Sequence, residues 1–291
     1  MGTVLLSGAS GFVAQNAAEK LRKTGFRTIG VSQSSRNLPH FDTVYEGSLA
    51  EPLKGVFKED IDAFIHCAYH SGRDDYTVNV DGTRLWAEQA EKEGVKQQIF
   101  LSSVSARADS PSSYSRAKHV LEKWFITHEF TVLRLGLVLG DGGLFQRMAG
   151  FVKKFPVLPI LDGGRSRVFV SGIEDVCRAL LLAVEQESWT SGQAWNLFQS
   201  EPYCLRKILE EIKKRYQVKC LFFPVPSKLV LGMVWILEKI PWMKLGISSN
   251  NIIGLKQNVS PKWESDYGKF GFADISLEQL ISNAFSPSPF F

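Results

Sequence analysis

A turn that contains two glycines follows the first apolar run of the chain. The run, Thr3–Leu6, leads into Ser7–Ala14, after which apolar residues recur at every fourth position, as on one face of a helix. Gly8 permits a tight turn, and Gly11 lets the backbone approach a pyrophosphate because it has no Cβ. The free N–H groups at the start of the following helix favour an anion. This strand–turn–helix unit predicts dinucleotide binding, with a purely structural turn as the alternative.

Short apolar runs and amphipathic stretches alternate along the first 185 residues. The apolar runs predicted to be the further strands are Thr28–Val31, Ala63–Ala68, Gln98–Leu101 and Thr131–Leu139. Helices are predicted over Val80–Gly94 and Ser115–His128. Buried strands that alternate with helices are typical of a parallel sheet covered on both faces. The predicted fold class is therefore α/β, a Rossmann-type doubly wound parallel sheet with a smaller C-terminal lobe.

The composition changes in the second half of the chain. Residues 140–170 are rich in glycine and proline, and prolines separate aromatic-rich stretches beyond the helix expected at Asp175–Glu187. We expect residues 1–185 to form an NAD(P)-binding domain and residues 186–291 a smaller substrate-binding lobe, with contributions from 140–170. Folds of this class place ligands at the carboxyl ends of the strands.

Charge and cysteine usage exclude several other classes of protein. The 291 residues are 44% hydrophobic and 22% charged, which is a globular composition, and the net charge of +4 with no Lys/Arg block gives no sign of a nucleic-acid partner. The four cysteines are scattered without a CxxC pair, so no metal site is predicted. The chain begins without a basic leader, and its most apolar stretch, Leu229–Leu237, is about half of a membrane span. We expect a cytoplasmic protein without a transmembrane segment; Leu229–Leu237 either packs the small lobe or lies at a membrane interface.

The end of the second expected strand bears on the cofactor. An acidic residue there would hold the ribose 2′-hydroxyl of NAD, but Val31–Arg36 contains no carboxylate. The hydroxyl of Ser32 and the guanidinium of Arg36 suit a 2′-phosphate better. NADP is therefore the preferred cofactor, and NAD remains the alternative if Arg36 is only a solvated charge.

A tyrosine and a lysine lie one helical turn apart in the helix that follows the fourth apolar run. The i, i+4 spacing places Tyr114 and Lys118 on one face, where a nearby ammonium is expected to lower the phenol pKa from about 10. Tyr114 could then exchange a proton with a substrate hydroxyl or carbonyl. Ser102 and Ser103 end the preceding strand, and a hydroxyl there can bind the same oxygen. The order of glycine turn, serine pair and tyrosine–lysine helix carries this interpretation, because the spacing alone is common.

With these motifs, the chain resembles the extended short-chain dehydrogenases/reductases of the NAD-dependent epimerase/dehydratase family, in the nucleotide-sugar epimerase/reductase branch. Four further segments resemble family motifs in family order. These are Ile65–Ala68, Asn79–Thr83, Leu133–Gly140 and Phe169–Val176. The resemblance covers essentially the whole chain and is stronger over residues 1–180 than beyond.

The resemblance implies roles for particular residues. Ser103, Tyr114 and Lys118 would form the catalytic triad, with Ser103 preferred over Ser102 because the second serine usually matches the catalytic position. Tyr69 would contact the substrate, and the family also implies a homodimer as one option. With Ser32 and Arg36, the expected cofactor contacts are Gly8, Ser10, Gly11, Phe12, Val13, Ser48, Leu49, Ala68, Asn79, Ser102, Lys118 and Val138.

The chain also departs from the family pattern. Ala14 replaces the third glycine, Ser48 stands where an aspartate is frequent, Gly172 replaces a common histidine, and Ser103 and Tyr114 are only eleven positions apart. By analogy, the short interval fits 4-keto-sugar reductases better than hexose 4-epimerases. No carboxylate follows Ser103, which argues against dehydration.

Three functions follow as hypotheses. The first is an NAD(P)-dependent reductase or epimerase of a nucleotide-diphospho-sugar, in which Arg165 and Arg167 clamp the diphosphate unless they are ordinary surface charges. The second is a reductase of an apolar carbonyl or hydroxysteroid-like substrate. The third is an assembly or regulatory subunit that binds NAD(P) without catalysis.

Overall fold

The computed structural model describes the chain except for residues 1, 35–37, 72–74, 227–252, 254–262 and 286–291. Its Cα packing separates two units. Unit 1 comprises Met1–Arg134 and Glu174–Leu197, and unit 2 comprises Leu135–Ile173 and Phe198–Phe291. The chain therefore crosses between the units three times. The functional division predicted after residue 185 stays a prediction.

Unit 1 contains a seven-stranded sheet in the order β11-β6-β5-β4-β1-β2-β3. The strands are β1 (Thr3–Ser7), β2 (Arg27–Ser32), β3 (Thr43–Glu46), β4 (Ala63–His66), β5 (Gln97–Ser103), β6 (Thr131–Leu135) and β11 (Ala194–Leu197). The pairs from β3 through β5 are parallel. The order reverses between β1 and β4, and a doubly wound sheet opens its ligand crevice at such a point. The predicted Rossmann-type α/β class is confirmed.

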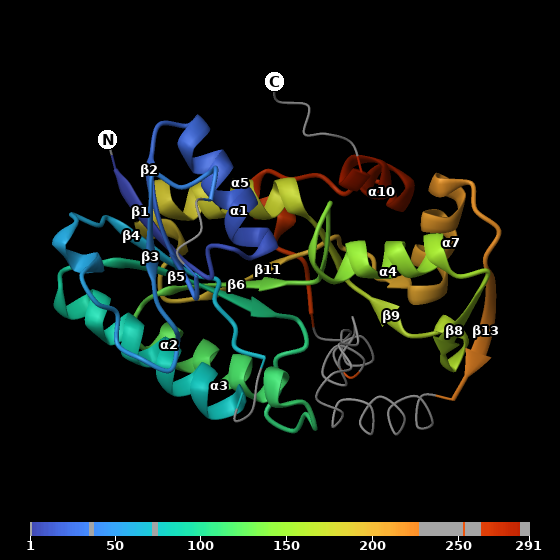
Figure 1. The fold of residues 1–291 in the computed structure, drawn as a ribbon, viewed down its shortest axis with the longest axis horizontal. Coiled ribbons are helices and arrows are strands. Elements are labelled where there is room, and N and C mark those ends of the chain that lie inside the picture. Colours follow the sequence, from blue (N-terminus) through green and yellow to red (C-terminus); the bar gives the residue numbers. More distant parts are fainter. Residues whose placement is uncertain (1, 35–37, 72–74, 227–252, 254–262, 286–291) are drawn as a thin grey trace. The chain divides into compact units, whose positions relative to one another are not determined.

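Helices cover both faces of this sheet. They are α1 (Phe12–Lys23), α2 (Asp75–Lys92), α3 (Ser113–Thr127), α5 (Ile173–Glu185) and α6 (Glu187–Thr190), with the 3-10 turn η1 (Val56–Lys58). Figure 1 shows α2 and α3 on one face and α1 and α5 on the other. All residues of β1 and β4 are buried, as expected for strands between two helical layers. Both predicted helices within residues 80–128 exist, although α2 begins five residues earlier.

One predicted strand is wrong in its extent. The apolar run Thr131–Leu139 divides at Gly136 into β6 and β7 (Leu137–Leu139), and β7 pairs with β10 (Val170–Gly172) in unit 2. A Cβ at Gly136 would lie 2.4 Å from the carbonyl oxygen of Phe169. The backbones therefore approach closely only because this position is glycine.

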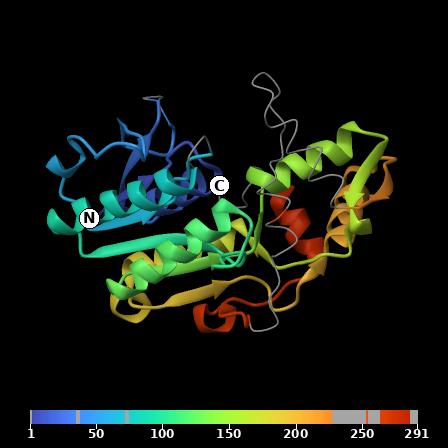
Figure 2. The same cartoon turned by 90° about the horizontal axis from the view of Figure 1, so that it is seen from below.

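The described part of unit 2 has three two-stranded sheets and an apolar core of its own. Its remaining elements are α4 (Gly143–Lys154), β8 (Val157–Leu161), η2 (Asp162–Gly164), β9 (Arg167–Val168), β12 (Tyr203–Cys204), α7 (Leu205–Tyr216), β13 (Leu221–Val225), η3 (Tyr267–Phe270) and α10 (Leu277–Phe285). β8 pairs with β13 in parallel, and β9 with β12 antiparallel. Figure 2 shows the red helix α10 between α4 and α7. There Phe285 contacts the rings of Phe145 and Tyr216.

No helix within the described parts of the chain combines the length and hydrophobicity that a membrane crossing requires. The stretch Leu229–Leu237 lies outside the described residues, so both interpretations of it stay predictions.

Candidate active site

The glycine turn joins β1 to α1 where the sheet order reverses. Gly8 has a φ of 65°, and a Cβ there would lie 2.8 Å from the Cα of Ala68. The Ser7 hydroxyl accepts hydrogen bonds from the N–H groups of Cys67 (3.0 Å) and Ala68 (3.1 Å). The ends of β1 and β4 are thus tied together, and Gly8 is required for both its backbone angle and this close approach.

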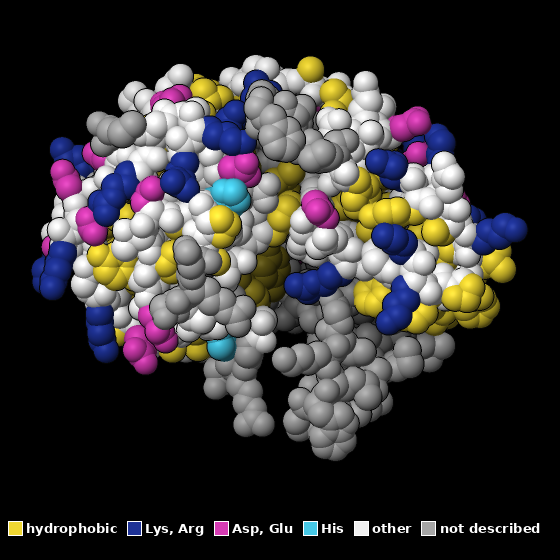
Figure 3. All heavy atoms as spheres, turned by 45° about the horizontal axis from the view of Figure 1, so that its top comes forward, with side chains coloured by type: hydrophobic (Ala, Val, Ile, Leu, Met, Phe, Trp, Pro, Cys, Tyr) yellow, Lys and Arg dark blue, Asp and Glu magenta, His cyan; other side chains and the backbone are white. Residues whose placement is uncertain are grey.

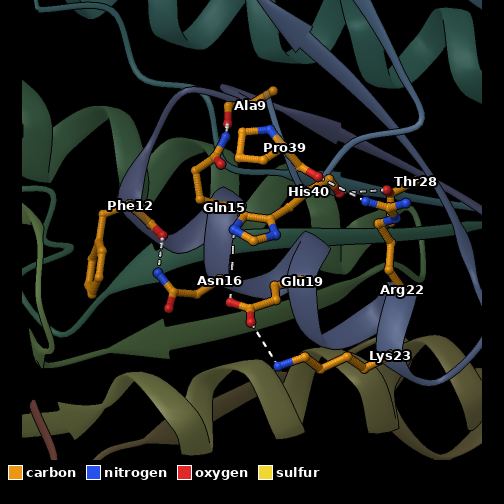
Figure 4. A network of polar contacts seen from close by, with 10 residues as sticks. All are labelled: Ala9, Phe12, Gln15, Asn16, Glu19, Arg22, Lys23, Thr28, Pro39 and His40. Atoms are coloured by element: carbon orange, nitrogen blue, oxygen red, sulfur yellow. Dashed lines mark hydrogen bonds and ion pairs between the residues drawn. The ribbon is translucent and has the colours of Figure 1, made fainter. Parts of the chain in front are cut away.

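The start of α1 faces the turn without a side-chain cap. Gly11 occupies the N-cap position in an extended conformation, so no side chain competes for the first N–H groups. Figure 4 shows the polar contacts that fix this region. The Gln15 amide donates to the Ala9 carbonyl within the turn, and the Arg22 guanidinium donates to the Pro39 carbonyl at 2.9 Å. The turn is therefore held on a rigid helix.

An open pocket of about 130 Å³ lies beside the turn. It is lined by seven residues that the sequence predicted as ligand contacts, namely Gly8, Ser10, Ser32, Ser48, Leu49, Ala68 and Tyr69. Five more were not predicted: Val31, Gln33, Gly47, His70 and Trp86. None of the twelve carries a carboxylate. The glycine turn, the uncapped helix and this pocket together fit a dinucleotide.

Several predicted cofactor contacts have other positions. Phe12 and Val13 lie in the first turn of α1, half-buried and outside this pocket lining. Asn79 donates to the carbonyls of His70 (2.7 Å) and Asp75 (2.5 Å) and accepts from the His70 N–H, so it holds the loop before α2. Arg36 lies outside the described residues. The roles of all four stay predictions.

The two serines at the end of β5 have different partners. The Ser103 hydroxyl contacts the Tyr114 phenol and lies 3.0 Å from the Ser105 hydroxyl. The Ser102 hydroxyl instead donates to Glu122 Oε1 at 2.5 Å in the interior. Since α3 begins at Ser113, both Tyr114 and Glu122 project from this helix toward the end of β5. The geometry favours Ser103 over Ser102 as the partner of Tyr114.

Lys118 lies one turn after Tyr114 and is 6% exposed. Its Nζ donates to the Leu101 carbonyl at 2.5 Å and lies 4.4 Å from the Phe100 ring centre and 5.8 Å from the Tyr114 ring centre. Burial lowers the pKa of Lys118 to about 8, while Cys67 and Glu122 act in the opposite direction. Ser103, Tyr114 and Lys118 form what we call the Ser–Tyr–Lys cluster.

The pKa of Tyr114 differs from the sequence expectation. Burial raises the pKa of this phenol, and the contact with Ser103 only partly opposes that effect. The Lys118 ammonium is directed to the Leu101 carbonyl, so the desolvation of the phenolate outweighs its attraction. The cluster therefore holds a protonated phenol beside a lysine whose own pKa approaches neutrality.

Tyr69 packs against this cluster. Its ring meets the Tyr114 ring edge-on at 5.0 Å, and its hydroxyl donates to Asp75 Oδ2 at 3.2 Å. Ser113 donates to the same carboxylate oxygen at 2.7 Å. Tyr69 and Lys118 also line a crevice that is too narrow to admit a water molecule. Tyr69 therefore borders both the dinucleotide pocket and the cluster, as a substrate-contacting residue would.

A buried ion pair joins α3 to β6. Glu122 accepts from Arg134 Nε at 3.0 Å and from Nη2 at 2.9 Å, a bidentate arrangement. The two side chains are 4% and 17% exposed. Neither residue was predicted as part of the site. The i, i+4 spacing of Lys118 and Glu122 could have indicated that Glu122 lies on the same face of the helix as Lys118.

The remaining predicted site residues belong to unit 2. Val138 lies in β7, and Arg165 and Arg167 are exposed. Arg167 donates to the Pro202 carbonyl at 3.1 Å and pairs with Glu201 at 3.8 Å. Roles for these three residues toward cofactor or substrate stay predictions.

The model of the NAD dependent epimerase/dehydratase family matches residues 4–197. Among curated proteins, NADH dehydrogenase (ubiquinone) 1 alpha subcomplex subunit 9, mitochondrial, of Arabidopsis thaliana is 22% identical over 257 residues, 81% of this chain and 64% of that protein. Ceramide reductase of Caulobacter vibrioides is 29% identical over 196 residues, 62% of this chain and 60% of that protein. This chain thus spans less than two thirds of the length of either.

A third curated relative is N-acetyl-alpha-D-glucosaminyl-diphospho-ditrans,octacis-undecaprenol 4-epimerase of Escherichia coli O157:H7. It is 24% identical over 290 residues, 84% of this chain and 83% of the relative. Among solved structures, UDP-glucuronic acid 4-epimerase from Bacillus cereus matches with a TM-score of 0.71 and 16% identity over 97% of both chains. UDP-glucose 4-epimerase from Thermotoga maritima matches with a TM-score of 0.66 and 21% identity over 88% of this chain and 97% of that one. These structural matches support the fold.

Proposed function

The chain belongs to the NAD dependent epimerase/dehydratase family and is an enzyme of the NAD-dependent oxidoreductase or epimerase type; from this premise we propose that it reduces or epimerises a nucleotide-diphospho-sugar by hydride transfer. The observation that carries the proposal is the contact of Tyr114 with Ser103 at the end of β5, beside Lys118. That contact stands beside Tyr69, which lines the pocket at the glycine turn. A proton donor and a dinucleotide pocket thus share one unit.

The chain's own residues would handle the proton. Tyr114 donates its phenolic proton to a carbonyl oxygen during reduction, or accepts one from a hydroxyl during oxidation. Ser103 donates a hydrogen bond to the same oxygen and orients it. The Lys118 ammonium stabilises the phenolate left after proton transfer. The nicotinamide cofactor, when bound, supplies or accepts the hydride.

The environment of Ser103 supports oxidation and reduction rather than dehydration. The two residues after it are Val104, which is fully buried, and Ser105, whose hydroxyl contacts Ser103. Neither can act as the extra acid that elimination of water requires. Two reactions remain. One is reduction of a 4-keto-sugar, and the other is transient oxidation of the sugar followed by reduction on the opposite face of the keto intermediate.

The pocket lining favours NADP. Ser32 at the end of β2 is buried and lines the pocket together with Gln33 and Ser48, and none of these bears a negative charge. A 2′-phosphate would therefore meet no carboxylate there. The predicted contact from Arg36 would add the positive charge.

A second candidate is reduction of an apolar carbonyl substrate. The named activity of the Caulobacter relative, ceramide reductase, supports it. The Arabidopsis relative supports a third, non-catalytic role as a subunit of an assembly, but the intact Ser–Tyr–Lys cluster argues against that role.

A ligand panel tests the proposal. Thermal unfolding is measured with NAD⁺, NADP⁺, nucleotide-sugars and long-chain carbonyl compounds, because a ligand at a hundredfold excess over its Kd stabilises the native state by about 2.7 kcal/mol. We expect NADP⁺ and at least one nucleotide-sugar to raise the Tm, and that sugar's keto form to oxidise NADPH. Stabilisation by a long-chain carbonyl alone would favour the second candidate. Stabilisation by a dinucleotide with no turnover of any substrate would favour the third.

A further inference from the structure

Exposed apolar side chains gather on one sheet of unit 2. Five large apolar or aromatic side chains of the described residues are strongly exposed, and four of them lie at β8 and β13. They are Phe155 (41%), Val157 (52%), Leu221 (70%) and Phe223 (59%). A contiguous exposed apolar surface on a folded protein commonly marks a binding surface.

The pairing of the two strands places these side chains on one face. Leu221 is in register with Val157, and Phe223 is in register with Pro159, which is also exposed. Alternate residues of a strand share a face, so Val157, Pro159, Leu221 and Phe223 point the same way. With the adjoining Phe155 they form what we call the β8–β13 face.

The opposite side of the same ribbon is apolar as well. Ile160 is buried in the core of unit 2, and Leu158 and Phe222 pack against that core. A half-exposed sheet ordinarily carries polar residues on its outward face. In this ribbon the outward positions 157, 159, 221 and 223 are all apolar instead. Because these side chains point away from the core, packing of the core does not require them to be apolar.

Lysines border the β8–β13 face. Lys153 and Lys154 directly precede Phe155, and Lys219 precedes Leu221 by two positions. Nζ of Lys153 lies 4.8 Å from the ring centre of Tyr216 in α7. Nζ of Lys154 lies 5.7 Å from the Phe155 ring centre. Within the described parts of the chain, no carboxylate lies within ion-pair distance of these three lysines. Figure 3 shows yellow and dark blue side chains interspersed over the region of α4, α7, β8 and β13.

We propose that the β8–β13 face docks on a membrane surface that contains anionic lipids. Phe155, Leu221 and Phe223 would enter the boundary between headgroups and acyl chains, and the lysines would meet lipid phosphates. The inference does not rest on the proposed reaction, because it uses no residue of the Ser–Tyr–Lys cluster.

Charge separates a lipid surface from a second copy of the chain as the occupant. A two-fold dimer through this face would bring the same patch of both copies together. Lys153, Lys154 and Lys219 of one copy would then approach those of the other with no carboxylate between them, and like charges at an interface are unfavourable. An anionic lipid surface complements the same lysines.

Vesicle co-sedimentation of the full chain tests the proposal. The probes are vesicles of phosphatidylcholine with phosphatidylglycerol and vesicles of phosphatidylcholine alone. We expect binding to the anionic vesicles that weakens with salt, and little binding to the neutral ones. Lys153→Gln/Lys154→Gln should weaken binding about 25-fold, because each basic side chain at an anionic surface contributes about fivefold. Leu221→Thr/Phe223→Thr should abolish the binding that remains at high salt.

A matched double variant controls for charge. Lys92→Gln/Lys96→Gln removes the same charge from an exposed part of unit 1 and should leave binding within about twofold. Retained dinucleotide-dependent thermal shifts would show that each variant is folded. Equal losses from both lysine pairs, or no binding of the unaltered chain to anionic vesicles, would overturn the proposal. Dimerisation that Leu221→Thr/Phe223→Thr abolishes would instead assign the face to a second copy.

Discussion

The interior of unit 1 and the β8–β13 face of unit 2 depart from the usual distribution of side chains in opposite directions. Unit 1 buries polar groups and pairs them: His66 Nε2 lies 2.8 Å from Gln98 Oε1, and Ser102 donates to Glu122. Unit 2 leaves Leu221 and Phe223 exposed. Burying a polar group costs free energy unless it is hydrogen-bonded, and an exposed apolar patch promotes association.

The difference shows where each unit accepts a cost in stability or solubility. In unit 1 the buried groups lie around Lys118. Burial lowers the pKa of this lysine to about 8, close to neutral pH. Burial similarly lowers the pKa of His66 to about 3, so this histidine is neutral and structural. In unit 2 the cost lies at the surface, where Leu221 and Phe223 are in contact with water. Five substitutions or conditions test this contrast.

Replacement of the phenol should have the largest effect. Tyr114→Phe keeps the ring that contacts Tyr69 and removes the proton donor, so kcat should fall by about 10²- to 10⁴-fold. Steady-state kinetics on the substrate found in the ligand panel provide the measurement. The dinucleotide-dependent thermal shift should persist. Turnover at the rate of the unaltered protein would remove Tyr114 from the mechanism.

Disruption of the buried ion pair should come next. Glu122→Gln removes the carboxylate that binds the Arg134 guanidinium in a bidentate manner, and breaking a buried ion pair lowers the free energy of unfolding by about 3 kcal/mol. Urea unfolding measures the loss. The control is Glu91→Gln on the exposed side of α2, which should change stability by less than about 0.5 kcal/mol. Similar losses for the two variants would mean that burial is not what makes Glu122 important.

The pH dependence of the reaction should follow Lys118. Its pKa of about 8 means that the ammonium is lost above that pH, and with it the stabilisation of the Tyr114 phenolate. We expect kcat/KM to fall about tenfold per unit above pH 8. Because the Glu122 charge raises the pKa of Lys118, Glu122→Gln should move this fall to lower pH. A profile that is flat to pH 10 would contradict this role of Lys118.

The same lysine also predicts a trend in stability. Its pKa is lower in the folded state than the ordinary value of 10.5, so between about pH 8 and 10.5 the unfolded chain binds more protons. The Lys118 contribution to the free energy of unfolding should therefore rise with pH across that window. The difference between the unaltered protein and Lys118→Met, measured by urea unfolding at several pH values, isolates this contribution.

The sequence predicted the parts of the site that depend on local spacing. The positions of Tyr114 and Lys118 on one helix face, and of Ser103 at a strand end, follow from helical and strand periodicity, and the structure has them so. The glycine turn was likewise predicted from adjacent residues. Gly8 meets Ala68 because neighbouring parallel strands end at the same edge of the sheet.

The features that the sequence did not predict depend on distant contacts. The division of the run Thr131–Leu139 requires the backbone of Phe169 to approach Gly136. Trp86 and His70 reach the pocket only through the packing of α2 and the loop before it. The raised pKa of Tyr114 results from desolvation, which the contact with Ser103 only partly opposes. The degree of burial depends on the whole fold and cannot be inferred from the spacing of residues in the sequence. The pairing of β8 with β13 joins segments separated by α7, so the outward apolar face could not be recognised from alternation alone.

The smallest expected effect completes the contrast within unit 2 itself. Phe223→Thr alters an exposed position of β13 and should change the free energy of unfolding by less than about 0.5 kcal/mol, since little apolar area returns to water. Ile208→Ala removes a fully buried side chain of α7 in the same unit and should cost about 3 kcal/mol. Urea unfolding without lipid compares the two variants. If Phe223→Thr cost as much as Ile208→Ala, Phe223 would be covered in solution, and the β8–β13 face would belong to the core. If it costs nothing, folding does not require the apolar side chain of Phe223, as expected for a face that is free to dock.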